Sequence, residues 1–272
     1  MNMKTICIAM LLVPSVVYTT ASDCHAGELL RKIQTEQSKV PNVEQNQVMQ
    51  NVFKNYNNLN VEVKNTLDIL WNNDAGNLLL RRLHNVIKDD NQRITILWDT
   101  CDEAGDSNLF NPNNLSIYLN KNKFGKCIGY RNGELCALSE TLDDVLFHEM
   151  THGLHTITGM VKANKRDTIQ HLHKFPNNRT IYDNCCESWS NDEEVRTITG
   201  WHLGKDRKLH FDCLNTNSYM VLKALKNKTP INRITQRVFH CDYSGLQDIS
   251  RYCRNKIKNI IIPQTKYLDA KI

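Results

Sequence analysis

The sequence predicts an α+β fold in which helices are arranged around a small mixed sheet. Leucine residues recur at helical spacing between residues 67 and 87. Short runs rich in β-branched and aromatic residues follow at 93–99, 115–119 and 134–138, and such runs are typical of strands. A second helical pattern begins at Thr141. This order of helix, strands and helix favours an α+β domain.

The first helices are expected before residue 90. An amphipathic pattern predicts a helix over residues 26–38. The Gln- and Asn-rich stretch 44–60 contains few apolar residues, which predicts a solvated helix or a loose segment. Residues 67–87 predict a pair of helices, because the turn-forming run at 72–76 interrupts the leucine pattern.

The helix that begins at Thr141 has a defined start. Asp144 stands three residues after Thr141, and this spacing predicts a capping box. The same helix contains residues 145–155, whose sequence is VLFHEMTHGLH. The strand predicted at 134–138 lies just before it and would offer an edge with which an extended chain segment can pair.

The N-terminus has the pattern of a secretory signal peptide, assigned to residues 1–21. Residues 6–18 form a mostly apolar run, small residues follow, and cleavage is expected after Ala21, with Ala26 as the alternative site. About 13 apolar residues are too few to span a bilayer, which needs roughly 20. We therefore expect a secreted chain with no stable membrane anchor.

Length and charge limit what the mature chain can be. The protein has 272 residues, of which 40% are hydrophobic and 23% charged, as in a globular protein. We expect an N-terminal extension over 22–60 and one catalytic domain over 61–272. The 34 basic and 29 acidic residues are spread along the chain. No basic stripe marks a nucleic-acid surface, so no nucleic-acid partner is expected.

The cysteine content also points to an oxidising compartment. The chain has ten cysteines, and removing the leader removes Cys7. The odd number that remains allows four disulfides and one free thiol, with a pairing that the sequence does not define. There is no CxxC pair, which argues against a zinc ribbon or a thioredoxin-like site. Three Asn-x-Ser/Thr sequons are present, at Asn114, Asn178 and Asn227.

The chemistry is concentrated in an HExxH motif, formed by His148, Glu149 and His152. Two histidines four residues apart lie about 40° from each other around a helix, so both imidazoles can bind one Zn²⁺ ion. Glu149 follows the first ligand, where its carboxylate can act as general base and then as general acid in peptide hydrolysis. This pattern predicts a zinc metalloendopeptidase that acts on a protein or peptide substrate.

A catalytic zinc ion needs a third protein ligand. His155 lies roughly 10 Å along the helix from His148, too far to share the ion, and we expect it to pack behind the ligands. Gly153 directly follows His152, so the metzincin spacing is excluded. The remaining candidates are Glu193 and Glu194, of which only one can face the metal, because neighbours on a helix point about 100° apart.

The segments HEMTHGLHTITG and EEVRTITG resemble the two zinc-site segments of clostridial neurotoxin light chains and of the NleD-like family of effector zinc metallopeptidases. The resemblance implies a zincin-like fold of the gluzincin type and a toxin or virulence effector that acts on a host protein. It implies that Glu194 is the third ligand and that Glu193, like His155, supports the ligands without touching the metal. It also implies a distal arginine that stabilises the transition state, for which the candidate is Arg233, followed by Arg237 and Tyr243.

Two other classes of protein remain open. The first is a disulfide-stabilised secreted binding protein in which the same residues hold a structural zinc ion. A fourth ligand such as His202 or His210 would favour that interpretation, whereas the intact general base Glu149 weighs against it. The second is a secreted interaction domain in which the histidines bind no metal.

Overall fold

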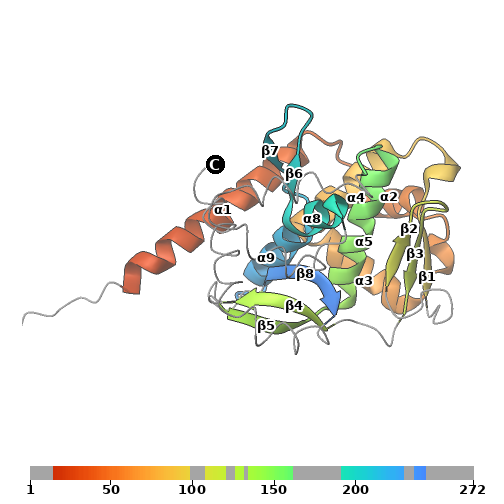
Figure 1. Ribbon diagram of the computed structural model, residues 1–272. Coiled ribbons are helices and arrows are strands. Elements are labelled where there is room, and N and C mark those ends of the chain that lie inside the picture. Colours follow the sequence, from red (N-terminus) through yellow and green to blue (C-terminus); the bar gives the residue numbers. More distant parts are fainter. Residues whose placement is uncertain are drawn as a thin grey trace, which may run out of the picture.

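The computed structural model describes the backbone of residues 15–98, 108–120, 126–131, 134–161, 191–229 and 236–242. Its architecture is mixed α+β, as predicted (Figure 1). The helices are α1 (Ser15–Ser38), α2 (Gln45–Val52), α3 (Val61–Trp71), α4 (Asp74–Val86), α5 (Leu142–Ile157), α8 (Asp192–Thr199) and α9 (Thr216–Lys226), with 3₁₀ turns at Tyr56–Asn58 and Asp90–Gln92. The strands are β1 (Thr95–Trp98), β2 (Leu109–Asn111), β3 (Ser116–Leu119), β4 (Lys126–Arg131), β5 (Glu134–Ser139), β6 (Trp201–Leu203), β7 (Leu209–Phe211) and β8 (Gln236–Asp242).

The described strands form three small sheets. In the first sheet the order is β1–β3–β2, with β1 parallel and β2 antiparallel to β3. The second sheet is antiparallel, with the order β5–β4–β8, and β6 and β7 form a hairpin. The three predicted strands correspond to β1, β3 and β5, and the first sheet is mixed, as expected. The strand expected to offer an edge, β5, is an outer strand of its sheet.

Helices α2, α3, α4, α5 and α9 share one hydrophobic core. The leucines of α4 that recur at helical spacing are fully buried: Leu78, Leu79, Leu80 and Leu83. The prediction of a solvated or loose segment at 44–60 is wrong for α2, because Val48, Met49 and Val52 are also fully buried. Few apolar residues occur there, but they fall on one face of the helix and are sufficient to hold it against α4.

The predicted pair of helices at 67–87 is confirmed, with the break at residues 72 and 73. Asn73 caps α4, since its side-chain oxygen accepts hydrogen bonds from the backbone N–H groups of Ala75 and Gly76 at 3.0 and 3.3 Å. A Cβ atom at Gly76 would lie 2.2 Å from the carbonyl oxygen of Leu70. Glycine is therefore required here for the close approach of α3 and α4.

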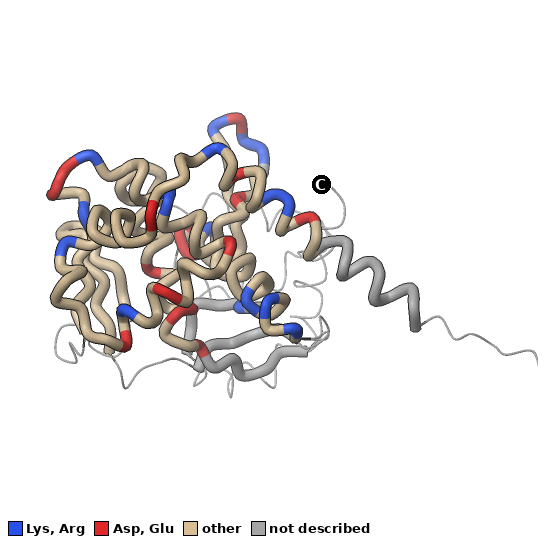
Figure 2. Tube along the Cα trace, turned by 180° about the vertical axis from the view of Figure 1, so that it is seen from behind, with Lys and Arg blue, Asp and Glu red and all other residues tan. Residues whose placement is uncertain are grey.

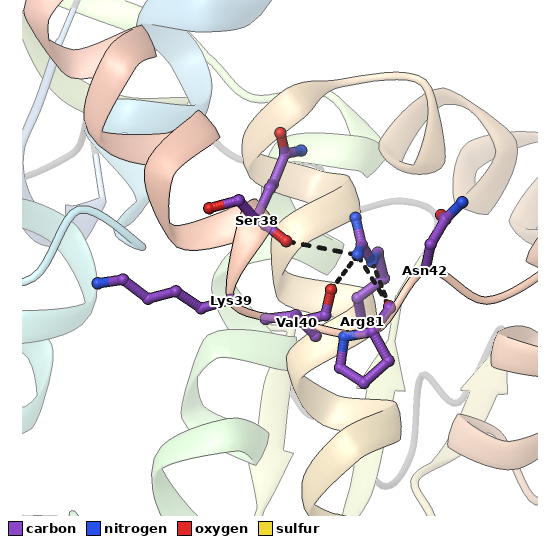
Figure 3. A pocket seen from close by; sticks show the side chains of 7 residues that line it. Ser38, Lys39, Val40, Asn42 and Arg81 are labelled. Atoms are coloured by element: carbon purple, nitrogen blue, oxygen red, sulfur yellow. Dashed lines mark hydrogen bonds between the residues drawn. The ribbon is translucent and has the colours of Figure 1, made fainter.

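The loop after α1 is attached to α4 through one arginine. The Arg81 guanidinium donates hydrogen bonds to the carbonyl oxygens of Gln37, Val40 and Pro41, two of them to Pro41 at 2.8 and 3.0 Å (Figure 3). Ile33 of α1 is fully buried in the common core. The described part of the expected N-terminal extension thus packs on the helices that follow it.

The helix that carries the HExxH motif, α5, runs past the first sheet (Figure 1). A Cβ atom at Gly153 would lie 2.9 Å from Ile94 Cδ1 and 3.5 Å from Phe110 Cε2. The glycine after His152 therefore allows close packing against the sheet, and the helix continues through it to Ile157.

Lys and Arg residues are interspersed with Asp and Glu residues along the described chain (Figure 2). Among the described helices, none is both long and apolar enough to cross a membrane. Cys213 is a buried free thiol, and burial raises the pKa of this thiol to about 11. The side chains of the other cysteines lie outside the described part of the structure.

Candidate metal centre

Helix α5 carries the HExxH motif and is fixed at its N-terminus. The predicted capping box is present, with the backbone N–H of Thr141 donating to Asp144 Oδ2 at 2.9 Å. Lys223 of α9 lies 2.6 Å from Asp143 Oδ2 and 2.9 Å from Asp144 Oδ1. The hydroxyl of Tyr219, one turn earlier on α9, also donates to Asp143. These contacts fix the first turn of α5 against α9.

The two histidines of the motif point to the same place. His148 and His152 are buried, and their Nε2 atoms lie 3.1 Å apart, with ring centroids separated by 4.7 Å. Glu194, from helix α8, completes the group. Its carboxylate oxygens lie 3.2 Å from His152 Nε2 and 3.5 Å from His148 Nε2. One ligand atom from each of the three residues lies within 4.8 Å of the others, close enough to hold one metal ion.

Contacts at both ends of helix α8 fix the position of Glu194. Asn191 caps the helix, and its side-chain oxygen accepts a hydrogen bond from the Glu194 backbone N–H at 3.0 Å. Gly200 ends the helix with a φ of 83°, a left-handed conformation that favours glycine. The buried Arg196 donates to Asp212 at 3.2 Å and to the Met160 carbonyl at 3.5 Å, which ties α8 to the end of α5.

The hydrogen bonds on the far side of each imidazole show which nitrogen carries the proton. His152 Nδ1 lies 3.2 Å from Glu193 Oε1, and an ionised carboxylate can only accept, so Nδ1 donates. His148 Nδ1 lies 3.0 Å from the hydroxyl oxygen of Thr216, which donates its own proton to the Thr197 carbonyl at 3.1 Å. With Nδ1 protonated, the neutral form of each imidazole presents an Nε2 lone pair, and a cation between the two Nε2 atoms would bind both. The donor set fits Zn²⁺.

Glu193 and Glu194 have different roles, as expected for neighbours on a helix. Glu193 Oε1 accepts hydrogen bonds from His155 Nδ1 at 2.5 Å and from the Thr197 hydroxyl at 3.2 Å, in addition to His152. His155 is almost fully buried and points to Glu193 and not to the ligand group. Glu193 and His155 thus lie on the Nδ1 side of His152, away from its Nε2 atom and from Glu194.

Burial and neighbouring charges shift the pKa values of the histidines and glutamates of the site. It lowers the pKa of His148 to about 3, with a contribution from the charge of Arg237, and it raises the pKa of Glu149 to about 8. Burial would also lower the pKa of His152, but Glu194 and Glu193 outweigh it and raise that pKa well above 6.5. Burial acts to raise the pKa of Glu194, but the two histidines hold it well below its usual value. The site therefore favours one positive charge next to Glu194.

One of the candidate arginines lies close enough to act on this site. Arg237, on β8, is buried and donates to Glu140 Oε1 at 2.7 Å. Asn217 of α9 forms two hydrogen bonds with the Arg237 backbone, at 2.7 and 2.9 Å, and so fixes its position. Its charge affects the pKa values of both His148 and Glu149. The first candidate, Arg233, and the third, Tyr243, lie outside the described residues.

The two histidines that would support a closed structural site lie on the β6–β7 hairpin. His202 and His210 are cross-strand partners whose rings stack at 5.8 Å. His210 Nε2 lies 2.8 Å from Asp206 on the same hairpin. Within the described part of the chain, the ligand group is limited to His148, His152 and Glu194.

The chain matches no known protein family, no curated protein and no solved structure. The chemistry of the site is therefore inferred from its own geometry.

Two residues of the site were missed by the sequence analysis. Thr197 lies four residues after Glu193 on α8, a spacing that places both side chains on one face of the helix and could have identified it. Thr216 is 68 residues away from His148, and no local pattern connects them.

Proposed function

We propose that this chain is an exported zinc-dependent endopeptidase of the zincin type, with His148, His152 and Glu194 as metal ligands. The observation that carries the proposal is the convergence of these three residues within 4.8 Å, with Glu149 on the same helix. Two histidines and a carboxylate are typical ligands of a catalytic zinc ion, which keeps one position open. A bound zinc ion would polarise the scissile carbonyl and lower the pKa of water.

Glu149 is the proposed general base. It is buried, with 7% of its surface exposed. Burial raises its pKa, together with the charges of Glu194 and Glu140, and none of the described residues forms a hydrogen bond with its carboxyl group. The carboxylate is therefore available to take a proton from the attacking water and to deliver it to the leaving amine.

Arg237 is the proposed donor to the oxygen that becomes negatively charged in the transition state. A buried guanidinium that is already fixed by Glu140 and Asn217 needs little reorganisation during the reaction. Its influence on Glu149 and His148 supports a position near the reacting group.

An extended protein segment is the proposed substrate. The outer strand β5 ends at Ser139, and α5 begins three residues later at Leu142. A peptide that pairs with this edge would be held by backbone hydrogen bonds next to the active-site helix. The resemblance to toxin and effector peptidases extends this proposal to a host protein. N-terminal sequencing of the exported chain tests the leader, and a mature chain that begins at Ser22 is expected.

The decisive experiment combines zinc content with peptide hydrolysis. Elemental analysis of the purified mature chain should give about one zinc ion per chain in the wild type and in Glu149→Gln, and little in Glu194→Ala. The exposed Glu62→Ala is the matched control and should retain its zinc. Incubation with a proteome-derived peptide library should give cleavage by the wild type, with a loss of about 10²–10⁴-fold in Glu149→Gln.

Two results would contradict the proposal. A folded wild type that binds no zinc would favour a secreted interaction domain. A wild type that binds zinc and whose peptide products match those of Glu149→Gln would favour a binding protein with a structural zinc ion.

A further inference from the structure

The two histidines of the metal centre are held by different chemistry on their Nδ1 sides. His152 donates to a carboxylate, that of Glu193. On this side His148 faces the hydroxyl of Thr216 at 3.0 Å, and this hydroxyl donates to the carbonyl oxygen of Thr197 at 3.1 Å. The hydroxyl of Thr216 and the carbonyl of Thr197 thus form an uncharged chain of hydrogen bonds on the Nδ1 side of His148.

The last turn of helix α8 shows which groups donate and which accept in this chain of hydrogen bonds. A carbonyl in the last turn of a helix has no partner within the helix. The backbone N–H of Gly200 donates to the Arg196 carbonyl at 2.7 Å, and that of Trp201 donates to the Thr199 hydroxyl at 3.3 Å. The Thr197 carbonyl is thus open to the hydroxyl of Thr216. Because the Thr216 hydroxyl donates its proton to this carbonyl, its oxygen accepts a hydrogen bond from His148 Nδ1.

Thr216 is held rigidly in this position. It is the first residue of α9 and is completely buried. The preceding residue, Asn215, caps the helix by accepting from the Ser218 N–H at 2.9 Å and donates to the Asp212 carbonyl at 2.8 Å. The hydroxyl therefore has little freedom to leave His148.

Thr197 contacts the residues that hold both histidines, Glu193 beside His152 and Thr216 beside His148. Its hydroxyl donates to Glu193 and lies 3.3 Å from His152 Nδ1, while its carbonyl accepts from Thr216. The same helix carries the third ligand, Glu194. One turn of α8 thus contacts, directly or through Thr216, every proposed ligand.

We infer that Thr216 is a positioning residue of the metal centre. It holds His148 in the Nδ1–H tautomer, so that Nε2 presents its lone pair to the ion, and it couples the start of α9 to the metal site through Thr197. The inference rests on the proposed metal function. It concerns a residue that touches neither the metal nor the substrate, so its effect must appear in metal binding and not only in catalysis.

The test measures zinc affinity by competition with a chromophoric chelator, using Thr216→Val, Thr216→Ser and the wild type. Valine has nearly the same shape but no hydroxyl, and the expected loss is about 10–100-fold in zinc affinity, the usual effect of removing such a support. Serine retains the hydroxyl and should restore affinity to within a few-fold of the wild type. Thr66→Val is the matched control, because Thr66 is buried in α3 and its hydroxyl donates to the Glu62 carbonyl of the same helix at 2.8 Å.

The absorption spectrum of the Co²⁺-substituted protein provides a second readout. A changed orientation of His148 should shift the ligand-field bands of Thr216→Val, whereas the bands of Thr66→Val should match the wild type. Equal zinc affinity and equal bands in a folded Thr216→Val would overturn the inference and leave the metal centre intact. A folded wild type without affinity for zinc would instead overturn the metal centre and the inference together.

If Thr216→Val does not fold, the wild type alone provides the test. In the ¹⁵N-labelled, zinc-loaded protein, the Nδ1 proton of His148 should exchange slowly with water, because a buried hydroxyl accepts it. Exchange as fast as that of the half-exposed His210 ring would overturn the inference.

Discussion

Lys223 of α9 lies 2.6 Å from Asp143 Oδ2 at the start of α5, the helix that carries the HExxH motif. It also contacts Asp144 at 2.9 Å, and both carboxylates are largely buried, with 9% and 6% of their side chains exposed. One ammonium group therefore contacts two acidic residues that would otherwise lie close together in the interior without a cation. This contact connects the stability of the fold to the position of the HExxH motif.

Replacing Lys223 by methionine should destabilise the protein. The change leaves Asp143 and Asp144 without their cation, and the expected loss is about 2–3 kcal/mol in the free energy of unfolding. Urea unfolding followed by circular dichroism measures it. The exposed Lys205→Met is the control and should change the free energy by less than about 0.5 kcal/mol. Equal midpoints for the two variants would contradict the assignment.

Asp143 should make this stability dependent on pH. Burial would raise the pKa of its carboxyl group, but hydrogen bonds from Lys223, Thr141 and Tyr219 outweigh burial and lower the pKa below 3.8. Since the folded-state pKa lies below the unfolded value, the contribution is present above about pH 4 and disappears as the pH falls through the folded pKa. The difference in stability between wild type and Asp143→Asn should therefore be constant near neutral pH and shrink in acid. A difference that grows on acidification would contradict this sign.

Arg237 should contribute to turnover and not to metal binding. Because its removal alone would leave the buried Glu140 without a partner, the informative variant is the double change Arg237→Gln with Glu140→Gln. We expect unchanged zinc content and a loss of about 10²–10³-fold in kcat, as for the removal of a transition-state donor. Glu140→Gln alone is the control and should retain most of the turnover. Full activity in the double variant would assign the role to another residue.

Gly76 should be intolerant of a side chain. Gly76→Ala introduces a Cβ atom 2.2 Å from the Leu70 carbonyl oxygen, which is backbone and cannot rotate away. The expected destabilisation is about 1–3 kcal/mol or more. Gly27→Ala is the matched control, since Gly27 also lies in a helix and has no atom within 4 Å of the new Cβ. That variant should be neutral or slightly stabilised.

The elements with strong periodic signals were predictable from the sequence. The pair α3 and α4, the strands β1, β3 and β5, and the capped helix α5 were found because leucine spacing, β-branched runs and a capping box each have a local cause. The strands β2, β6 and β7 have three residues each, too short for any period to appear. Helix α2 was misjudged because three apolar residues in register are enough for burial even when the composition is polar.

The residues of the site also differ in how far the sequence predicts them. His148, Glu149 and His152 share one helix, and their proposed chemistry was predicted from their spacing alone. Glu194 needed a resemblance as well, since geometry left two adjacent glutamates open. The contact between the Thr216 hydroxyl and His148 depends on how α9 packs against α5 and α8. No local sequence pattern predicts packing of this kind.

The ligands of the metal centre come from two helices that are distant in the chain. A metal ion held jointly by α5 and α8 would act as a reversible cross-link, closing a loop between residues 152 and 194 that the backbone alone closes at an entropic cost. The ion would then be a structural clamp as well as a chemical group. The chain loaded with zinc should melt at a higher temperature than the chelated chain, by an amount that rises with the concentration of free zinc.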